Sequence, residues 1–175
     1  MRVDKLTTKF RESLEQAQSL ALGSDHAYIE PPHLVLAMLE QQDGPRALLE
    51  RAGVQIDGLR QAARDLMNKL PQVQGQEQVQ VGRDLVSLLQ AAEKEGIKRD
   101  DAFIASELFF LALCDHKGDM AQAARNAGLS RKAMEMAIAA VRGGHKVDNP
   151  EAEGQREALK KYTLDLTERA RIGKL

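Results

Sequence analysis

The stretch "DAFIASELFFLALCD", residues 101–115, decides how the chain is organised, because it repeats the pattern of "HAYIEPPHLVLAMLE", residues 26–40. In each stretch an aromatic residue and an isoleucine precede a short break, and a run of mostly apolar residues follows. A segment that is apolar on most sides is typical of a helix buried in a protein core. Proline fits the first turn of a helix, so Pro32 favours a helix start at this point of the first stretch. The sequence therefore predicts two equivalent core helices.

The similarity extends well beyond these two stretches. Sliding the chain along itself without any gap aligns Phe10–Met67 with Leu85–Arg142 and keeps the apolar pattern; we call this the repeat alignment. Both segments contain the same Ala-Gly stop after a short helix, at Gly53 and at Gly128. We predict an all-α protein made of two tandem four-helix repeats, about 1–70 and 82–142, packed pseudo-symmetrically into one domain over 1–142. Each repeat alone is small for a stable core, which favours packing of the two together.

The stretch between the repeats is less clear. In "LPQVQGQEQVQVG" glutamine occupies every second position from Gln72 to Gln80. Such alternation is compatible with a strand. We predict an extended linker instead, because no other strand candidate is found to pair with it.

Composition excludes several classes of protein. Net charge is −1 over 175 residues, which argues against a nucleic-acid-binding module. The charged N-terminus is not a signal peptide, and the longest apolar run is too short to cross a membrane. A single cysteine, Cys114, rules out an internal disulfide and favours the reducing cytoplasm. Cys114 aligns with Leu39, so it is interpreted as a small core residue.

Three residues in the first stretch have the spacing of metal ligands: His26, Glu30 and His33. Under the repeat alignment they become Asp101, Ala105 and Leu108, which are not a ligand set, although the apolar pattern around them is kept. We therefore interpret the three as scaffold and predict no metal site, and a metal hydrolase ranks last among the hypotheses.

The sequence has no phosphate-binding loop of the type G-x-x-x-x-G-K-[ST], so we predict that this chain is not an enzyme and holds no cofactor.

The composition changes after the repeats. The stretch "GGHKVDNPEAEG" at 143–154 is rich in glycine and charge, and it predicts a flexible linker over 143–155. The following "QREALKKYTLDLTERARIGKL", 155–175, has an amphipathic pattern and predicts a helix over 156–175. Residues 151–175 are not expected to pack on the repeats.

Several motifs resemble one family. "MRVDKLTTKF", "AQSLALG", "FIASELF", "VRGG" and the final stretch over 155–175 are, in that order, similar to the N-terminal region of the Clp-family AAA+ protein disaggregases. The last motif is similar to the segment that leads into the first ATPase module, and it favours the disaggregases over their protease-partnered relatives.

The resemblance implies a substrate-recognition domain. Such a domain captures unfolded or aggregated polypeptide for a homo-hexameric, ATP-hydrolysing ring that works with a DnaK-type chaperone. The resemblance also implies substrate contacts at Thr7, Asp101 and Glu107, with Leu108 beside them. The chain departs from the family pattern at Ala91 and Glu95, where leucines lining a groove are expected. The alternative is an adaptor-docking domain that binds a folded partner, as in the protease-partnered relatives.

Overall fold

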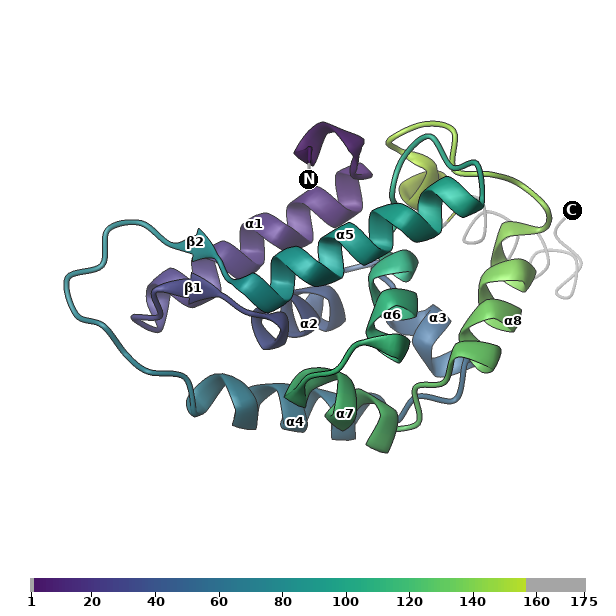
Figure 1. Ribbon diagram of the computed structural model, residues 1–175. Coiled ribbons are helices and arrows are strands. Elements are labelled where there is room, and N and C mark those ends of the chain that lie inside the picture. The colour runs from purple at the N-terminus through teal and green to yellow at the C-terminus, as the bar shows by residue number, and fades with distance from the viewer. Residues whose placement is uncertain (1, 157–175) are drawn as a thin grey trace, which may run out of the picture.

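The computed structural model describes residues 2–156, and these fold mainly as helices (Figure 1). A short 3-10 turn over Val3–Lys5 precedes the first repeat, which contains α1 (Thr8–Gly23), α2 (Pro31–Glu40), α3 (Arg46–Arg51) and α4 (Ile56–Asn68). The second repeat contains α5 (Arg83–Lys98), α6 (Ser106–Asp115), α7 (Asp119–Asn126) and α8 (Arg131–Arg142). The all-α prediction is confirmed, and the repeat alignment places α2 on α6 with the same bounds.

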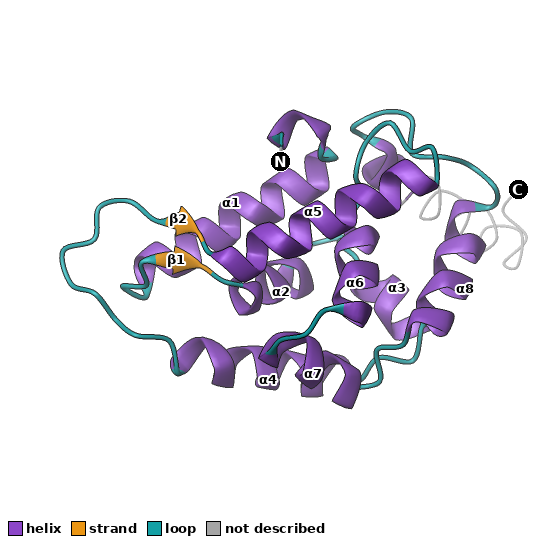
Figure 2. Ribbon diagram, in the orientation of Figure 1, coloured by secondary structure: helices purple, strands orange, loops and turns teal. Residues whose placement is uncertain are grey.

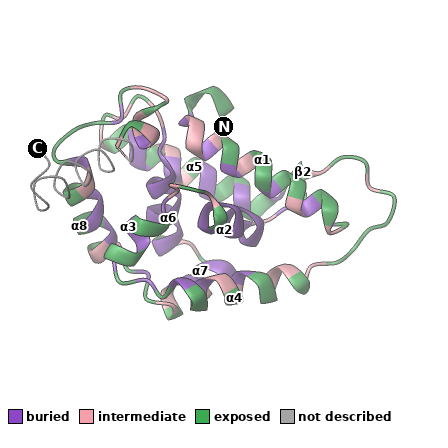
Figure 3. Cartoon of the chain, turned by 180° about the vertical axis from the view of Figure 1, so that it is seen from behind, coloured by how far each residue is buried: buried purple, intermediate pink, exposed green. Residues whose placement is uncertain are grey.

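The two apolar stretches form the centre of the core. Every residue of α2 except Glu40, and every residue of α6 except Asp115, is buried (Figure 3). Helix α1 covers α2, and α5 covers α6 in the same way. The shorter helices pack across the repeats, because α3 lies against α8 and α4 lies against α7. Each repeat therefore supplies part of the other repeat's core.

A small parallel strand pair corrects the linker prediction. Gln80–Val81 (β2) pairs with Tyr28–Ile29 (β1), as Figure 2 shows, so the end of the glutamine-rich stretch is a strand after all. The partner lies just before α2, where the sequence pattern is dominated by the helix signal that follows. A strand this short leaves no periodicity to recognise.

The equivalent contact exists on the other side of the molecule. Leu6 forms a parallel bridge with Ile104. Ile104 corresponds to Ile29 in the repeat alignment, and continuing the alignment toward the N-terminus matches Leu6 with Val81; Ile29 and Val81 are also partners. The start of each repeat thus pairs with the loop before the central helix of the other repeat.

The segment after α8 also differs from its prediction. Residues 147–156, which we call the strap, run back over the second repeat to the start of α1 (Figure 1). The backbone carbonyl of Val147 accepts hydrogen bonds from the amides of Ala102 (2.8 Å) and Phe103 (3.3 Å), and the carbonyl of Pro150 accepts from the amide of Thr8 (2.8 Å). The expectation of a flexible connector that does not pack on the repeats is therefore wrong for the strap. The predicted helix over 156–175 lies, except for Arg156, outside the described residues.

Candidate functional site

The four residues implied by the resemblance lie at the junction of the two repeats. Thr7 precedes α1, and its amide donates to the carbonyl of Ile104 (3.0 Å), which brings it beside the loop that carries Asp101. Glu107 and Leu108 follow directly in the first turn of α6. The structure thus gathers residues from both repeats, and it buries the side chains of all four.

Leu108 does not offer the apolar contact expected of it. Its side chain is fully buried and faces α5, where a Cβ added at Gly96 would lie 3.5 Å from its Cδ1 atom. The physical reason is its position on α6, which is surrounded by the core on almost every side. Any apolar contact with a ligand has to come from other residues.

Asp101 is held by an arginine that the sequence analysis did not single out. Both of its carboxylate oxygens accept from Nη1 of Arg142, at 3.1 and 2.8 Å. The amide of Val147 in the strap donates to the same carboxylate (3.1 Å). The side chains of Asp101 and Arg142 are 0% and 8% exposed, so this ion pair is desolvated. Removing one partner of a buried pair typically costs about 3–5 kcal/mol.

Glu107 joins the same network from α6. It accepts from Nε of Arg142 (3.1 Å), and Arg156 of the strap donates to both of its oxygens (3.0 and 3.1 Å). Burial alone would raise the pKa of this carboxyl, but the charges of Arg156 and Arg142 and their hydrogen bonds outweigh burial and lower it. Glu107 is therefore ionised and bridges α6, α8 and the strap.

Glu153 of the strap is the third buried carboxyl of the site, after Asp101 and Glu107. Its Oε2 atom accepts from the Thr7 hydroxyl and from the amide of Ser106 at the start of α6 (3.2 Å). Burial, and then the negative charge of Glu107, raise the pKa of Glu153 to about 7. The pKa values of Glu107 and Glu153 are therefore shifted in opposite directions, because two arginines pair with Glu107, whereas burial and the charge of Glu107 dominate at Glu153.

The role of Glu153 becomes clear from the repeat. In the first repeat Glu30 caps α2 through its own side chain, in a capping box with His33. The equivalent residue before α6 is Ala105, which has no capping group. Glu153 supplies from the strap the carboxylate that the second repeat lacks.

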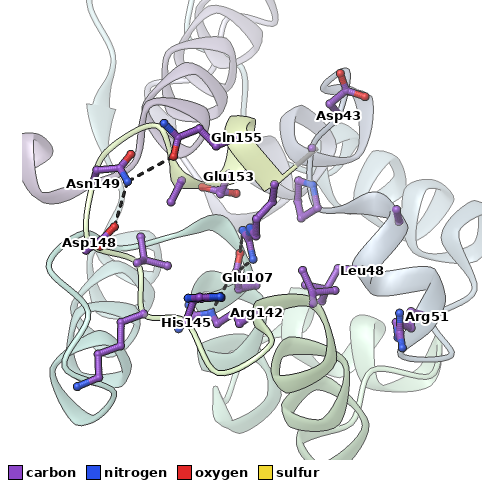
Figure 4. A pocket seen from close by; sticks show the side chains of 18 residues that line it. Asp43, Leu48, Arg51, Glu107, Arg142, His145, Asp148, Asn149, Glu153 and Gln155 are labelled. Atoms are coloured by element: carbon purple, nitrogen blue, oxygen red, sulfur yellow. Dashed lines mark hydrogen bonds and ion pairs between the residues drawn. The ribbon is translucent and has the colours of Figure 1, made fainter. Parts of the chain in front are cut away.

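A cavity of about 800 Å³ opens beside this network (Figure 4). Its walls come from α3, the start of α6, the end of α8 and the strap. Leu48, Val141 and Val147 give it apolar surface, and Arg51, Glu107 and Arg142 give it charge. In the close view Glu107 and Arg142 lie at the centre, with Glu153 and Gln155 above them on the strap. An apolar lining with a few convergent polar groups is typical of a ligand-binding pocket.

Sequence reasoning missed Arg142, Glu153 and Arg156. The "VRGG" motif contains Arg142 and was the available signal. The other two stand in a stretch whose glycines and charges predicted a flexible linker, and no local pattern reveals that such a stretch folds back.

Glu95, where a groove-lining leucine is expected, is only 7% exposed and serves another purpose. It accepts from Arg99 (2.6 Å) and from Arg131 (2.9 Å), and so joins α5 to α8. Burial opposes ionisation, but these two arginines lower the pKa of the Glu95 carboxyl. Ala91 packs partly buried against the core. The end of α5 is therefore an ion-pair junction, not an apolar groove.

The histidines of the opening stretch contact each other. Nδ1 of His26 lies 2.8 Å from Nε2 of His33, and Nδ1 of His33 accepts from the amide of Glu30 (2.9 Å). A neutral His33 that accepts at Nδ1 carries its proton at Nε2, and so it donates to His26. The turn before α2 brings the two rings together, which the sequence analysis did not expect. Among residues 2–156, no group of three or more His, Cys, Asp or Glu side chains is arranged to hold a metal ion.

Cys114 is a core residue, as interpreted from its alignment with Leu39. Its thiol is buried and contacts the carbonyl of Phe110 (3.4 Å). Burial, and then the nearby Asp115, raise the pKa of this thiol to about 11, so it is protonated and unreactive at neutral pH.

In the part of the chain that the structure describes, no helix is long and apolar enough to span a membrane.

Comparison with known proteins places these features in a family. Residues 5–127 match the Clp repeat (R) N-terminal domain. The chain is 45% identical to the chaperone protein ClpB of Vibrio cholerae and 44% identical to that of Pseudomonas putida, each over 177 aligned residues that cover the whole chain. It spans about a fifth of the length of these curated relatives (21%).

Solved structures share the fold at low sequence identity. The N-terminal domain of Hsp104 from Candida albicans has a TM-score of 0.73 at 19% identity, with 85% of this chain and 99% of that chain covered. A complex of the ClpV N-domain with a VipB peptide has a TM-score of 0.66 at 23% identity, with 81% and 89% covered.

Proposed function

The chain belongs to the Clp repeat N-terminal domain family, and from this premise we propose that it captures segments of unfolded or aggregated polypeptide for a AAA+ disaggregase. The observation that carries the proposal is the cavity at the junction of the repeats, with an apolar wall and a desolvated charge network. Unfolded chains offer both apolar side chains and unpaired backbone groups, and a mixed surface can bind either.

Apolar and charged residues of the cavity contribute to binding in different ways. Leu48 and Val141 present apolar surface from the two repeats. Asp101 and Glu107 hold Arg142 in place, since both carboxylates accept from its guanidinium group. One atom of this guanidinium, Nη2, is buried without a hydrogen-bond partner among the described residues. A buried donor of this kind favours a ligand that brings an acceptor, such as a peptide carbonyl.

The wider setting follows from the relatives and is part of the proposal. The ATP-hydrolysing ring, its homo-hexameric assembly and its collaboration with a DnaK-type chaperone belong to a longer protein, of which this chain resembles about a fifth. In such a ring weak binding by each domain would suffice, because tethered copies act at a high effective concentration. A cytoplasmic location remains a prediction from the sequence.

The experiment is binding of a chemically denatured, fluorescently labelled model protein. We expect Leu48→Ser and Glu107→Gln to weaken binding about tenfold, whereas Glu135→Gln, an exposed carboxyl on α8, leaves it unchanged. Thermal melting of each variant identifies those that fail to fold. Unchanged binding by folded Leu48→Ser and Glu107→Gln variants would refute the proposal.

Adaptor docking remains the second candidate. The observation that favours it is the shared fold with an N-domain that was solved with a VipB peptide. This candidate gains if the same variants keep their affinity for denatured protein and lose a folded partner instead.

A further inference from the structure

The three polar residues implied as substrate contacts all bind the strap. Thr7 donates to the Glu153 carboxylate. Asp101 accepts from the amide of Val147, and Glu107 accepts from both terminal nitrogens of the Arg156 guanidinium. Each polar residue of the set therefore has a partner in the strap.

The strap binds through a short and specific pattern. Residues 152–156 form a helical turn, so Glu153 and Arg156, three positions apart, project from the same side. Glu153 caps the start of α6, and Arg156 forms a bidentate pair with Glu107. Before this turn the Val147 amide donates to the Asp101 carboxylate, and the Val147 carbonyl accepts from the amides of Ala102 and Phe103.

Several features of the strap favour its detachment from the repeats. Within the strap only Val147 and Glu153 are buried, and the other residues are exposed or half-buried. It is held mainly by hydrogen bonds and ion pairs and not by apolar burial, and a hydrogen bond that is exchanged for one with water or with another ligand contributes little net free energy. The strap is anchored in part by Glu153, a carboxyl group buried close to the ionised Glu107. When Glu153 is charged, docking of the strap therefore carries an electrostatic cost.

We propose that the strap is an internal ligand that forms one wall of the cavity and covers part of the polypeptide site, and that the site's preferred partner is a segment with a glutamate or glutamine three positions before an arginine in a helical turn. The glutamate or glutamine takes the place of Glu153, whose side-chain oxygen accepts from Thr7 and from the start of α6. The arginine takes the place of Arg156 at Glu107. A polypeptide of this pattern displaces the strap, and polypeptides without it compete poorly. The inference rests on the proposed function in taking this junction as a polypeptide site.

The test uses the whole chain, residues 1–175, and the labelled peptide "VDNPEAEGQR", residues 147–156, acetylated and amidated. The parent chain should bind it weakly, because the tethered strap competes at an effective concentration on the order of millimolar. Arg156→Glu places a carboxylate against Glu107 and expels the strap, so this variant should bind the peptide at least tenfold more tightly. Arg46→Glu is the matched control, because it reverses the charge of an arginine whose exposed ion pair is with Glu50 and not with the strap.

A second peptide tests the pattern itself. Replacing its final arginine by glutamate should abolish binding to the Arg156→Glu chain. If both peptides bind that chain equally, or if the parent and the folded Arg156→Glu chain bind the first peptide equally, the proposal is overturned.

A second chain variant keeps the test decisive if Arg156→Glu does not fold. Glu153→Gln retains the acceptor for Thr7 and removes the buried charge, so at pH 8 it should hold the strap more tightly and bind the peptide more weakly than the parent. Equal or tighter peptide binding would contradict the proposal. A failure of the proposed function would give a different result. In that case the variants would change peptide binding as described, but the chain would not bind denatured model protein at all.

Discussion

Gly53 and Gly128 show how closely the repeats approach at single residues. Both have positive φ, +86° and +103°. At Gly53 a Cβ would meet no atom within 4 Å, whereas at Gly128 it would lie 2.7 Å from the carbonyl oxygen of Gly53. At both positions the positive φ would strain the backbone of any other residue, but only at Gly128 is there also no room for a side chain.

This difference gives a matched pair of variants. Gly53→Ala should lower the free energy of unfolding by about 1–2 kcal/mol through the strained φ alone. Gly128→Ala should cost roughly 1–3 kcal/mol more, because the added methyl group pushes the repeats apart. Each kcal/mol corresponds to about 2–4 °C in Tm for a chain of this size. Equal losses in calorimetric melting would show that the contact between the two loops does not limit stability.

His33 predicts a dependence on pH. Burial, and then the neighbouring His26, lower the pKa of His33 to about 4, from 6.5 when the chain is unfolded. The folded protein therefore binds fewer protons between these values. The stabilising contribution is complete above pH 6.5 and is lost as pH falls toward 4. The Tm of His33→Gln should fall less steeply than that of the parent from pH 7 to pH 4.5, and parallel curves would contradict this assignment.

At the scale of elements, the strap and α6 form a unit that responds to pH in the opposite direction. Glu153 faces Glu107 and Ser106 of α6 and Thr7 before α1, and the nearest charged partners of Glu107 are Arg142 of α8 and Arg156 of the strap. Its pKa is raised from 4.5 to about 7, so the docked strap takes up a proton that the free strap releases. Docking is strongest below pH 4.5 and weakens as pH rises to about 7.

Amide exchange can follow this change. Protection of the Ala102 amide, which donates to the carbonyl of Val147, should decrease between pH 5 and pH 7.5 after correction for intrinsic rates. Glu153→Gln removes the titrating group and should give constant protection. A parent chain whose protection is equally constant would show that Glu153 does not control docking.

The elements also show what the sequence can predict. The central helices α2 and α6, and their equivalence, follow from a long apolar pattern. The strand pair does not, because Gln80–Val81 is too short to leave a period. At the site, the resemblance pointed to Thr7, Asp101 and Glu107, but the strap residues that bind them were out of reach. A carboxylate that caps a helix from a distant part of the sequence, as in the strap, leaves no local signal.

At the scale of the whole molecule, the contacts between repeats are reciprocal. Helix α3 packs on α8 and α4 on α7, and the start of each repeat pairs with a loop of the other. Neither repeat can complete its core without the other, so stability belongs to the pair.

Separated halves test this. We expect fragments 1–74 and 75–175 to be largely unfolded alone by circular dichroism and to regain helix when mixed in equal amounts. Gly128→Ala in the second fragment should weaken the association. A first fragment that melts cooperatively by itself would contradict the reciprocal core.

The same reciprocity bears on the origin of the fold. A two-fold rotation exchanges Leu6 with Val81 and Ile104 with Ile29. Contacts related in this way can form whether or not the two repeats are covalently connected. Two separate copies of one ancestral repeat would satisfy both strand pairs at once, as a homodimer with exchanged N-terminal segments. Gene duplication and fusion would then have allowed the two halves to diverge. In the present chain one half has its own glutamate before its central helix, and the other, with Ala105 in that place, takes a carboxylate from the strap.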